Sequence, residues 1–345
     1  MDKKRILIIG GGFGGLTVAN QLKHSKFHIT LIDKTNHHVF QPLLYQVAMA
    51  ALSPGDIAVP IRSVFRGREK VKVLLENAVS IDKAKRRVYV KSNDIEDFID
   101  YDYLVLAVGA QHSYFGKNEW EKYAPGLKTL NDALTIRQKV FSSLEIAETL
   151  HETKETAKYL TFVIVGGGPT GVELAGALSE ILLVNVKKDY RSIDTHQINI
   201  YLIEGIDRIL PSFPEKLSGS AQKVLENLGI KILLNTRVMD INEKGVLIGD
   251  KIIETKNIIW ATGNVAQPLL KTLNIPIDKS GRVIVEKNLT IKNYPDIFVI
   301  GDAAAFKDKR GIDLPDVAQV AIQQGKFVAK LIMGADDLYK SAVFN

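Results

Sequence analysis

Short apolar runs, rich in β-branched residues and ended by glycine or an acid, recur along the chain. Two of them, Arg5–Ile9 and Thr161–Val165, run into glycine-rich turns that precede expected helices. Strands and helices that alternate in this way predict the α/β class with parallel sheets. The pattern also predicts strands at His28–Ile32, Val71–Leu75, Arg87–Val90, Tyr103–Val108, Ile198–Ile203, Asn257–Trp260 and Asp296–Ile300, and a helix from about Pro315 to Met333.

Both glycine-rich turns have the spacing GxGxxG and form an internal repeat. The glycines are Gly10, Gly12 and Gly15 in the first turn and Gly166, Gly168 and Gly171 in the second. The first glycine of such a motif makes the tight turn, the second lets a pyrophosphate approach the backbone, and the third lets the helix pack on the strand. One motif alone is weak evidence. Two, each between a strand and a helix, predict two dinucleotide-binding units.

An acidic residue ends the second strand of each expected unit. Asp33 follows its glycine turn by the usual distance for a carboxylate that binds ribose, which is about 20 residues. Glu204 comes later after its own turn, because a longer helix and loop are expected from about Gly171 to Gln197. An acid there favours NADH over NADPH, since it would repel a 2′-phosphate, although Arg208 nearby weakens this argument.

Three later strands end in glycines that can lie against a bound nucleotide. They lead into Gly109-Ala110, Ala261-Thr262-Gly263 and Gly301-Asp302. The last pair suits the ribityl and pyrophosphate groups of a flavin. The chain is expected to pass between the two units near residues 109–116 and again near residues 263–268.

Composition excludes several classes of function. The chain has 345 residues, which is long enough for two hydrophobic cores. It has no cysteine, so it holds no redox disulfide, thiolate nucleophile, or Cys-ligated zinc or iron–sulfur cluster. The net charge of +6 is spread along the chain, which argues against a nucleic-acid-binding tail. The basic start of the chain is followed by too short an apolar run for an export signal, so a cytoplasmic protein is expected.

Several longer motifs carry a family resemblance. They are residues 36–48 (NHHVFQPLLYQVA), with 52–54 (LSP) and 60–62 (PIR), residues 166–176 (GGGPTGVELAG) and residues 318–325 (AQVAIQQG). Together with the two fingerprints, they resemble type II NADH dehydrogenase, the single-subunit, non-pumping NADH:quinone oxidoreductase of the two-dinucleotide-binding flavoproteins. The resemblance extends from residue 1 to about residue 333. It implies two Rossmann-like, three-layer domains arranged as in glutathione reductase.

The resemblance also implies cofactors, partners and location. FAD would take hydride from NADH and pass two electrons to a membrane quinone, ubiquinone or menaquinone, with no metal. The enzyme would lie on the inner face of the cell membrane, as a homodimer. Residues 335–345 do not match the family's C-terminal membrane-anchoring segment, so membrane binding is expected to be weakened. The expected domains are 1–115 with 265–334 for FAD, 116–264 for NADH, and the tail 335–345.

The residues expected at each cofactor follow from these motifs and the resemblance. For FAD they are Gly10, Gly12, Gly14, Gly15, Asp33, Lys34, Gln41, Ala107, Gly109, Gly301, Asp302, Ala318 and Gln319. For NADH they are Gly166, Gly168, Pro169, Thr170, Gly171, Glu173, Glu204, Ala261, Thr262 and Gly263.

Three residues are candidates for catalysis, each with a structural alternative. Glu173 resembles the family residue near the junction of nicotinamide and flavin, or is an acid stabilised by the helix dipole in the first turn. Gln319 and Gln323 share one helix face and match the family's quinone motif, or they cap buried backbone near the flavin. His37 and His38 are expected to have a structural role in their loop, and Trp260 to be a core residue.

Two other functions stay open from the sequence. One is a soluble NADH-dependent diaphorase that passes electrons to a different acceptor. The other is a non-catalytic redox sensor that holds FAD and NADH and changes partners when reduced.

Overall fold

The computed structural model describes residues 4–92, 95–150, 154–334 and 343–344. The chain forms two compact units, each with its own parallel sheet. The first contains Met1–Val39, Val59–Gln111 and Asn264–Asn345, and the second contains Phe40–Ala58 and His112–Gly263. Most of the expected tail, residues 335–342 and 345, lies outside the described residues.

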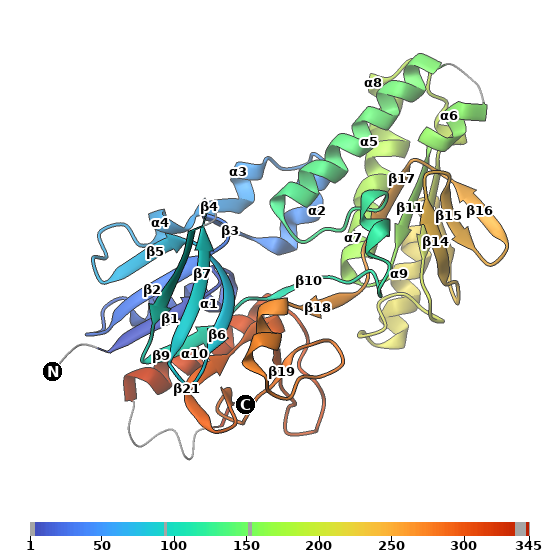
Figure 1. Cartoon of the computed structure of the whole chain (residues 1–345). Helices are drawn as coiled ribbons and strands as arrows, with labels where there is room; N and C mark the ends of the chain where they lie inside the picture. Colours follow the sequence, from blue (N-terminus) through green and yellow to red (C-terminus); the bar gives the residue numbers. More distant parts are fainter. Residues whose placement is uncertain (1–3, 93–94, 151–153, 335–342, 345) are drawn as a thin grey trace. The chain divides into compact units, whose positions relative to one another are not determined.

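The first unit is built on a six-stranded sheet in the order β20-β21-β9-β1-β2-β5 (Figure 1). All neighbours are parallel except β20 and β21. The bounds are β1 Arg5–Ile9, β2 His28–Asp33, β5 Val71–Leu75, β9 Tyr103–Leu106, β20 Thr290–Ile291 and β21 Tyr294–Val299. Its apolar side chains alternate between two buried clusters, one on each face of the sheet.

Helices cover one face of this sheet and a second sheet covers the other. Helices α1 (Phe13–Leu22) and α10 (Ala318–Gly334) pack against each other, and both add residues to the cluster that contains Ile6 and Ile8. On the other face, the cluster that contains Leu7 and Ile9 extends to an antiparallel sheet. That sheet consists of β6 (Asn77–Asp82), β7 (Arg87–Ser92) and β8 (Ile95–Asp100). The unit is therefore three layers thick (Figure 1).

The second unit repeats this plan with four parallel strands in the order β13-β12-β11-β17. Their bounds are β11 Thr161–Val165, β12 Asn199–Ile203, β13 Ile230–Leu233 and β17 Asn257–Trp260. The helices that contact them include α5 Leu130–Leu150, α6 Lys154–Tyr159, α7 Pro169–Ser179 and α9 Glu215–Asn227. An antiparallel sheet, β14 (Val238–Asn242), β15 (Gly245–Ile248) and β16 (Lys251–Glu254), shares a buried cluster with β11 and β17.

The segment Phe40–Ala58 belongs to the second unit, although it lies within the range 1–115 expected for the FAD domain. Its helix α2 (Leu44–Ala48) packs against α5 and α7, and its residues Leu44, Val47 and Ala48 are buried. Local sequence cannot predict this packing, because it depends on helices far along the chain. The short strands β3 (His37–Val39) and β4 (Ala58–Pro60) flank the segment and pair with each other.

Several element bounds differ from the expected ones by one to three residues, and two of these differences lie next to expected cofactor residues. Strand β9 ends at Leu106 rather than at residue 108, before Gly109 takes a positive φ of 65°. Helix α10 begins at Ala318 rather than near Pro315, and the N–H of Val317 donates to the carbonyl of Pro315 in a turn before it. Each of the other predicted strands overlaps a strand of the structure.

Candidate dinucleotide-binding sites

The first and third glycines of the first turn are required by close packing. Gly10 has a φ of 104°, and a Cβ atom there would collide with the carbonyl group of Ala107. A Cβ atom on Gly15 would collide with the carbonyl oxygen of Gly10. Gly14 is also buried, and its Cβ would lie 3.0 Å from the side chain of Ile300. These glycines let α1 lie directly against the carboxyl end of the sheet.

Gly12 is different, because a Cβ atom there would meet nothing within 4 Å. The residue is exposed and is the N-cap of α1, with an extended φ of −75° and ψ of −169°. Packing therefore does not explain this glycine, but a group that approaches the helix N-terminus closely would. The open position, with the N–H groups of the first helical turn beside it, fits the pyrophosphate of a dinucleotide.

Asp33 holds the turn from the end of β2. Its Oδ2 accepts a hydrogen bond from the N–H of Gly11 at 2.5 Å, and its Oδ1 accepts bonds from the N–H and hydroxyl of Thr35, both at 2.7 Å. The carboxylate thus fixes the glycine loop before any ribose binds. A contact to ribose stays a prediction.

His38 contacts the same loop from the other side. Its Nδ1 lies 3.0 Å from the carbonyl oxygen of Gly11, so Nδ1 carries the proton and donates. Its ring meets that of Phe13 edge to face, with centroids 5.0 Å apart. Burial lowers the pKa of His38, which keeps the imidazole neutral. These contacts agree with the expected structural role, and the described part of the chain contains no cluster of three His, Asp or Glu residues suited to a metal ion.

The second turn has the same geometry in the other unit. Gly166 has a φ of 114°, and a Cβ on Gly171 would collide with the carbonyl oxygen of Gly166. Gly168 is the N-cap of α7 and, like Gly12, has nothing within 4 Å of its Cβ position. Glu204 accepts from the N–H of Gly167 through Oε2 at 2.7 Å and from the N–H of Ile206 through Oε1 at 3.1 Å. Two parallel sheets therefore present the same cradle for a pyrophosphate.

The helix after the second turn explains the late position of Glu204. Helix α7 continues through a π-helical turn, Glu180–Asn185, into α8 (Val186–Asp189). A loop and the short turn Thr195–Gln197 then lead to β12. The extra residues lengthen the helix and loop, as expected, and Glu204 still reaches the glycine turn.

Glu173 does not lie in the first turn of α7, so its explanation by the helix dipole is wrong. The helix begins at Pro169, and its first turn contains no acid. The side chain is exposed overall, but partial desolvation of the carboxyl group raises its pKa. Stabilisation by a helix dipole would lower the pKa instead.

The other residues expected at FAD differ in their surroundings. Gly109, with its Cβ position open, and Gly301 both have positive φ, and Gly301 lies in a short turn with Asp302. Lys34 is exposed beside Asp33, and Ala107 packs over Gly10. Gln41 lies in the second unit, where its Nε2 donates to the carbonyl of Lys128 at 3.2 Å. The structure therefore does not group Gln41 with the first glycine turn.

The glutamines of α10 divide into two kinds. Gln319 and Gln323 are exposed, one helical turn apart. Gln324 is buried, and its Oε1 accepts from the N–H of Gly301 at 2.7 Å. The capping role considered for Gln319 and Gln323 is thus performed by Gln324, which is not among the residues predicted from the sequence. Gln324 lies on the buried face of the helix with Ala321 and Gly325, and this position in the helical pattern could have indicated a buried role.

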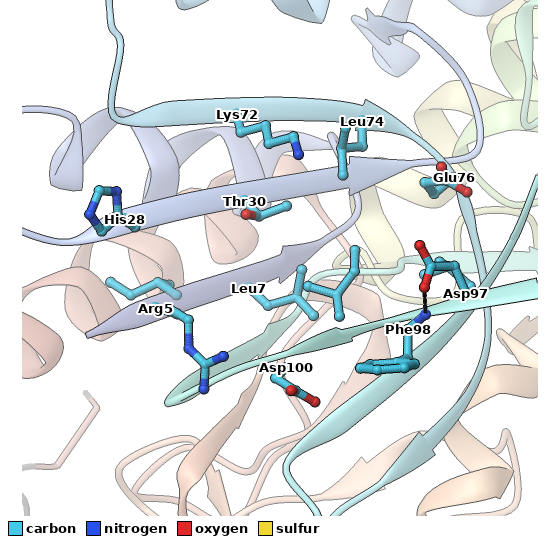
Figure 2. A pocket seen from close by; sticks show the side chains of 13 residues that line it. Arg5, Leu7, His28, Thr30, Lys72, Leu74, Glu76, Asp97, Phe98 and Asp100 are labelled. Carbon is cyan, nitrogen blue, oxygen red and sulfur yellow. Dashed lines mark hydrogen bonds between the residues drawn. The ribbon is translucent and has the colours of Figure 1, made fainter. Parts of the chain in front are cut away.

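A cavity of about 390 Å³ lies elsewhere in the first unit, between the parallel sheet and β8 (Figure 2). Arg5, His28 and Lys72 line it from the parallel sheet, and Asp97 and Phe98 line it from β8. None of the residues expected at a cofactor lines this cavity.

Comparison with known proteins identifies the family. The model of the pyridine nucleotide-disulphide oxidoreductase family matches residues 4–325. The type II NADH:quinone oxidoreductase NdhA of Mycobacterium tuberculosis is 40% identical, over 97% of this chain and 73% of the relative. The chain belongs to the type II NADH:quinone oxidoreductase family. The Staphylococcus haemolyticus protein of that name is 30% identical, over 96% of this chain and 82% of its own length.

Solved structures confirm the fold of this family member. The structure titled NDH2 from Plasmodium falciparum in complex with NADH matches with a TM-score of 0.90 at 24% identity, over 96% of this chain and 83% of that chain. The predicted fold class, two Rossmann-like units in an oxidoreductase, is therefore confirmed. No helix within the described ranges is long and apolar enough to cross a membrane.

Proposed function

We propose that this protein oxidises NADH and passes two electrons to a quinone by way of FAD. The observation that carries the proposal is the repeated cradle: an open glycine at a helix N-terminus, tied to a carboxylate at the end of the next strand. Two cradles in one chain suit a donor and a resident cofactor. Membership of the type II NADH:quinone oxidoreductase family supports this choice among flavoprotein reactions.

The first unit would hold FAD. Gly12 gives the pyrophosphate access to the N-terminus of α1, and Asp33 fixes the loop and stands where a ribose hydroxyl would donate. Gly301 and Asp302 would lie along the ribityl chain. Bound FAD supplies an acceptor of hydride and a donor of two electrons, and the protein supplies position and surroundings.

The second unit would hold NADH. Gly168 admits the pyrophosphate at the N-terminus of α7, and Glu204 faces the adenosine ribose. Its carboxylate would repel the extra phosphate of NADPH. The carboxyl group of Glu173, with its raised pKa, is suited to holding a proton near the transferred hydride.

Quinone would meet the exposed start of α10. Gln319 and Gln323 offer amide groups on one face, and Val317 just before the helix is 46% exposed. Amide donors and an apolar neighbour suit a ring with two carbonyl oxygens. This position is a proposal, as are ubiquinone or menaquinone as the substrate.

Association with the inner face of the cell membrane also belongs to this proposal. The net charge of +6 would attract anionic lipid, although it is spread along the chain. Pairing of two copies is an expectation from the family resemblance, and analytical ultracentrifugation would test it.

One experiment tests the whole proposal. The purified protein should show a flavin absorption spectrum, lose it on addition of NADH under nitrogen, and recover it on addition of a short-chain quinone. Recovery with ferricyanide but not with quinone would favour a diaphorase. No bleaching by NADH would overturn the proposal.

A further inference from the structure

Phe115 occupies a backbone conformation that phenylalanine rarely adopts. The N–H of Lys117 donates to the carbonyl of Tyr114 at 2.9 Å, and the two central residues of this turn, Phe115 and Gly116, have φ of 51° and 89°. Positive φ at both positions defines a type I′ turn, in which Asn, Asp or Gly normally comes first. A bulky side chain there is strained, and such strain is concentrated at functional sites.

The core does not require the ring of Phe115. Trp260 already stacks on Tyr114 at 5.2 Å and meets Trp120 edge to face at 5.7 Å, and all three are buried. Phe115 touches Trp260 only by an edge, with centroids 6.2 Å apart, and is 68% exposed. Core packing therefore gives no sufficient reason for the strained turn.

The turn is fixed at the carboxyl end of β17. The N–H of Ser113 donates to the carbonyl of Gly263 at 2.9 Å, and the indole N–H of Trp260 donates to the carbonyl of Ser113 at 3.0 Å. The ring lies next to Gly263, where a Cβ atom would be 3.0 Å from its Cζ atom. All these residues belong to the second unit.

The order of the strands places Phe115 relative to a dinucleotide. In the order β13-β12-β11-β17, Glu204 follows β12 on one side of the glycine turn and Phe115 stands at β17 on the other. A dinucleotide on such a sheet lies across the carboxyl ends of the strands, with its adenosine ribose at the acid and its pyrophosphate at the glycines. Its nicotinamide half therefore extends toward β17.

We infer that the ring of Phe115 is a stacking surface for the nicotinamide half of the dinucleotide bound by the second unit. It is a positioning residue, which limits the rotation of the nicotinamide ring before hydride transfer. The inference rests on the proposed function. It extends that function by naming a contact outside every motif of the sequence analysis.

The test compares NAD⁺ with ADP-ribose, which lacks only the nicotinamide ring. Binding of NAD⁺ and of ADP-ribose to the FAD-loaded protein is measured by calorimetry for the wild type, Phe115→Asn and Phe115→Tyr. Asparagine suits the positive φ, so Phe115→Asn should melt at or above the wild-type temperature. It should bind NAD⁺ about twofold to twelvefold more weakly, the range that aromatic stacking gives, and bind ADP-ribose as the wild type does.

The controls separate stacking from other roles. Phe115→Tyr keeps the aromatic ring and should bind NAD⁺ with wild-type affinity. Ile252→Asn changes a 47% exposed site on β16 and should leave the binding of both ligands unchanged. Unchanged NAD⁺ binding in Phe115→Asn, or equal weakening of both ligands, overturns the inference and leaves the proposed function standing. Failure of the wild type to bind either ligand overturns the proposed function as well.

Discussion

At the scale of single residues, Gly12 allows cofactor binding to be separated from folding. Its extended backbone and open Cβ position accept valine, so Gly12→Val should fold with a free energy of unfolding within about 1 kcal/mol of wild type. The valine methyls would nevertheless occupy the path of the pyrophosphate, and flavin content should fall below about a tenth of wild type, since each 1.4 kcal/mol of lost affinity is tenfold. Flavin absorbance per protein measures this directly.

Two further glycines provide the controls for that prediction. Gly168→Val should keep flavin and lose NADH binding, because Gly168 has the same geometry in the second unit. Gly10→Val should fail to fold well, since it combines a positive φ with a collision against Ala107. Full flavin content in Gly12→Val would show that the first turn does not bind the pyrophosphate.

Glu204 is expected to set the choice between NADH and NADPH. Glu204→Gln keeps an oxygen that can accept from the N–H of Gly167 but removes the charge that would repel a 2′-phosphate. The ratio of kcat/KM for NADH over NADPH should fall about tenfold, equivalent to about 1.4 kcal/mol. If the ratio and the melting temperature both stay unchanged, another residue discriminates between NADH and NADPH. Arg208 would then be the next residue to substitute.

The raised pKa of Glu173 predicts how the stability of the folded protein changes with pH. A carboxyl group whose pKa is higher in the folded state favours folding while protonated, and this contribution is lost as pH rises through the folded pKa. Glu173→Gln is neutral at every pH. Its melting temperature relative to wild type should therefore rise as pH increases from about 4 to 7, by only about 1–2 °C because the side chain is exposed. A difference that is constant over this range would contradict the raised pKa.

At the scale of elements, the two faces of α10 are expected to serve two different functions. Gln319→Ala should slow reoxidation of the reduced flavin by quinone about tenfold, as expected for loss of a hydrogen bond worth about 1.4 kcal/mol, and leave flavin reduction by NADH intact. Stopped-flow measurement of the two half-reactions distinguishes these effects. Gln324→Ala should instead lower the free energy of unfolding by about 1–3 kcal/mol, because the partly buried N–H of Gly301 loses its acceptor. Equal slowing of both half-reactions in Gln319→Ala would assign that residue to the flavin.

Most of the parallel strands could be predicted from the sequence because each carries its own signal, but β13 (Ile230–Leu233) was not predicted. Strands such as Arg5–Ile9 and Thr161–Val165 are continuous apolar runs, as both faces of the sheet are covered. Strand β8 was not predicted, because its sequence IEDFID is mostly exposed and is a strand only through its pairing with β7. The packing of α2 was likewise not predicted, since its partners α5 and α7 come far later in the chain.

The residues of the candidate site also differ in whether the sequence predicts them. The fingerprint glycines and the two acids were predicted because the backbone geometry of the turn demands particular residues at fixed spacing. Gln324, and Phe115 in its proposed role, were not predicted, because these roles depend on tertiary contacts, with Gly301 and with Gly263. Spacing indicates where a cofactor lies, but not which neighbouring side chains support it.

At the scale of the whole molecule, the internal repeat goes beyond the glycine motifs. Each unit has a parallel sheet with the glycine turn on a central strand and an antiparallel three-stranded sheet on one face. Each unit also uses a carboxylate from the next strand to hold the middle glycine N–H. The sequence differs in that position, Asp33 against Glu204, while the hydrogen bond is the same. The two units thus share the geometry of the cradle but not the acidic residue that holds it.

The last prediction concerns the attraction of the whole molecule to a membrane surface. A net charge of +6 spread over the chain gives a long-range attraction to anionic lipid, and such attraction is screened beyond about 8–10 Å at physiological salt. The protein should therefore sediment with phosphatidylglycerol vesicles at low ionic strength and be released at about 0.5 M salt, where the screening length is about 4 Å. Vesicles of neutral phosphatidylcholine serve as the control and should bind little at either salt concentration. Sedimentation that persists at about 0.5 M salt would mean that apolar contact, rather than charge, holds the protein on the membrane.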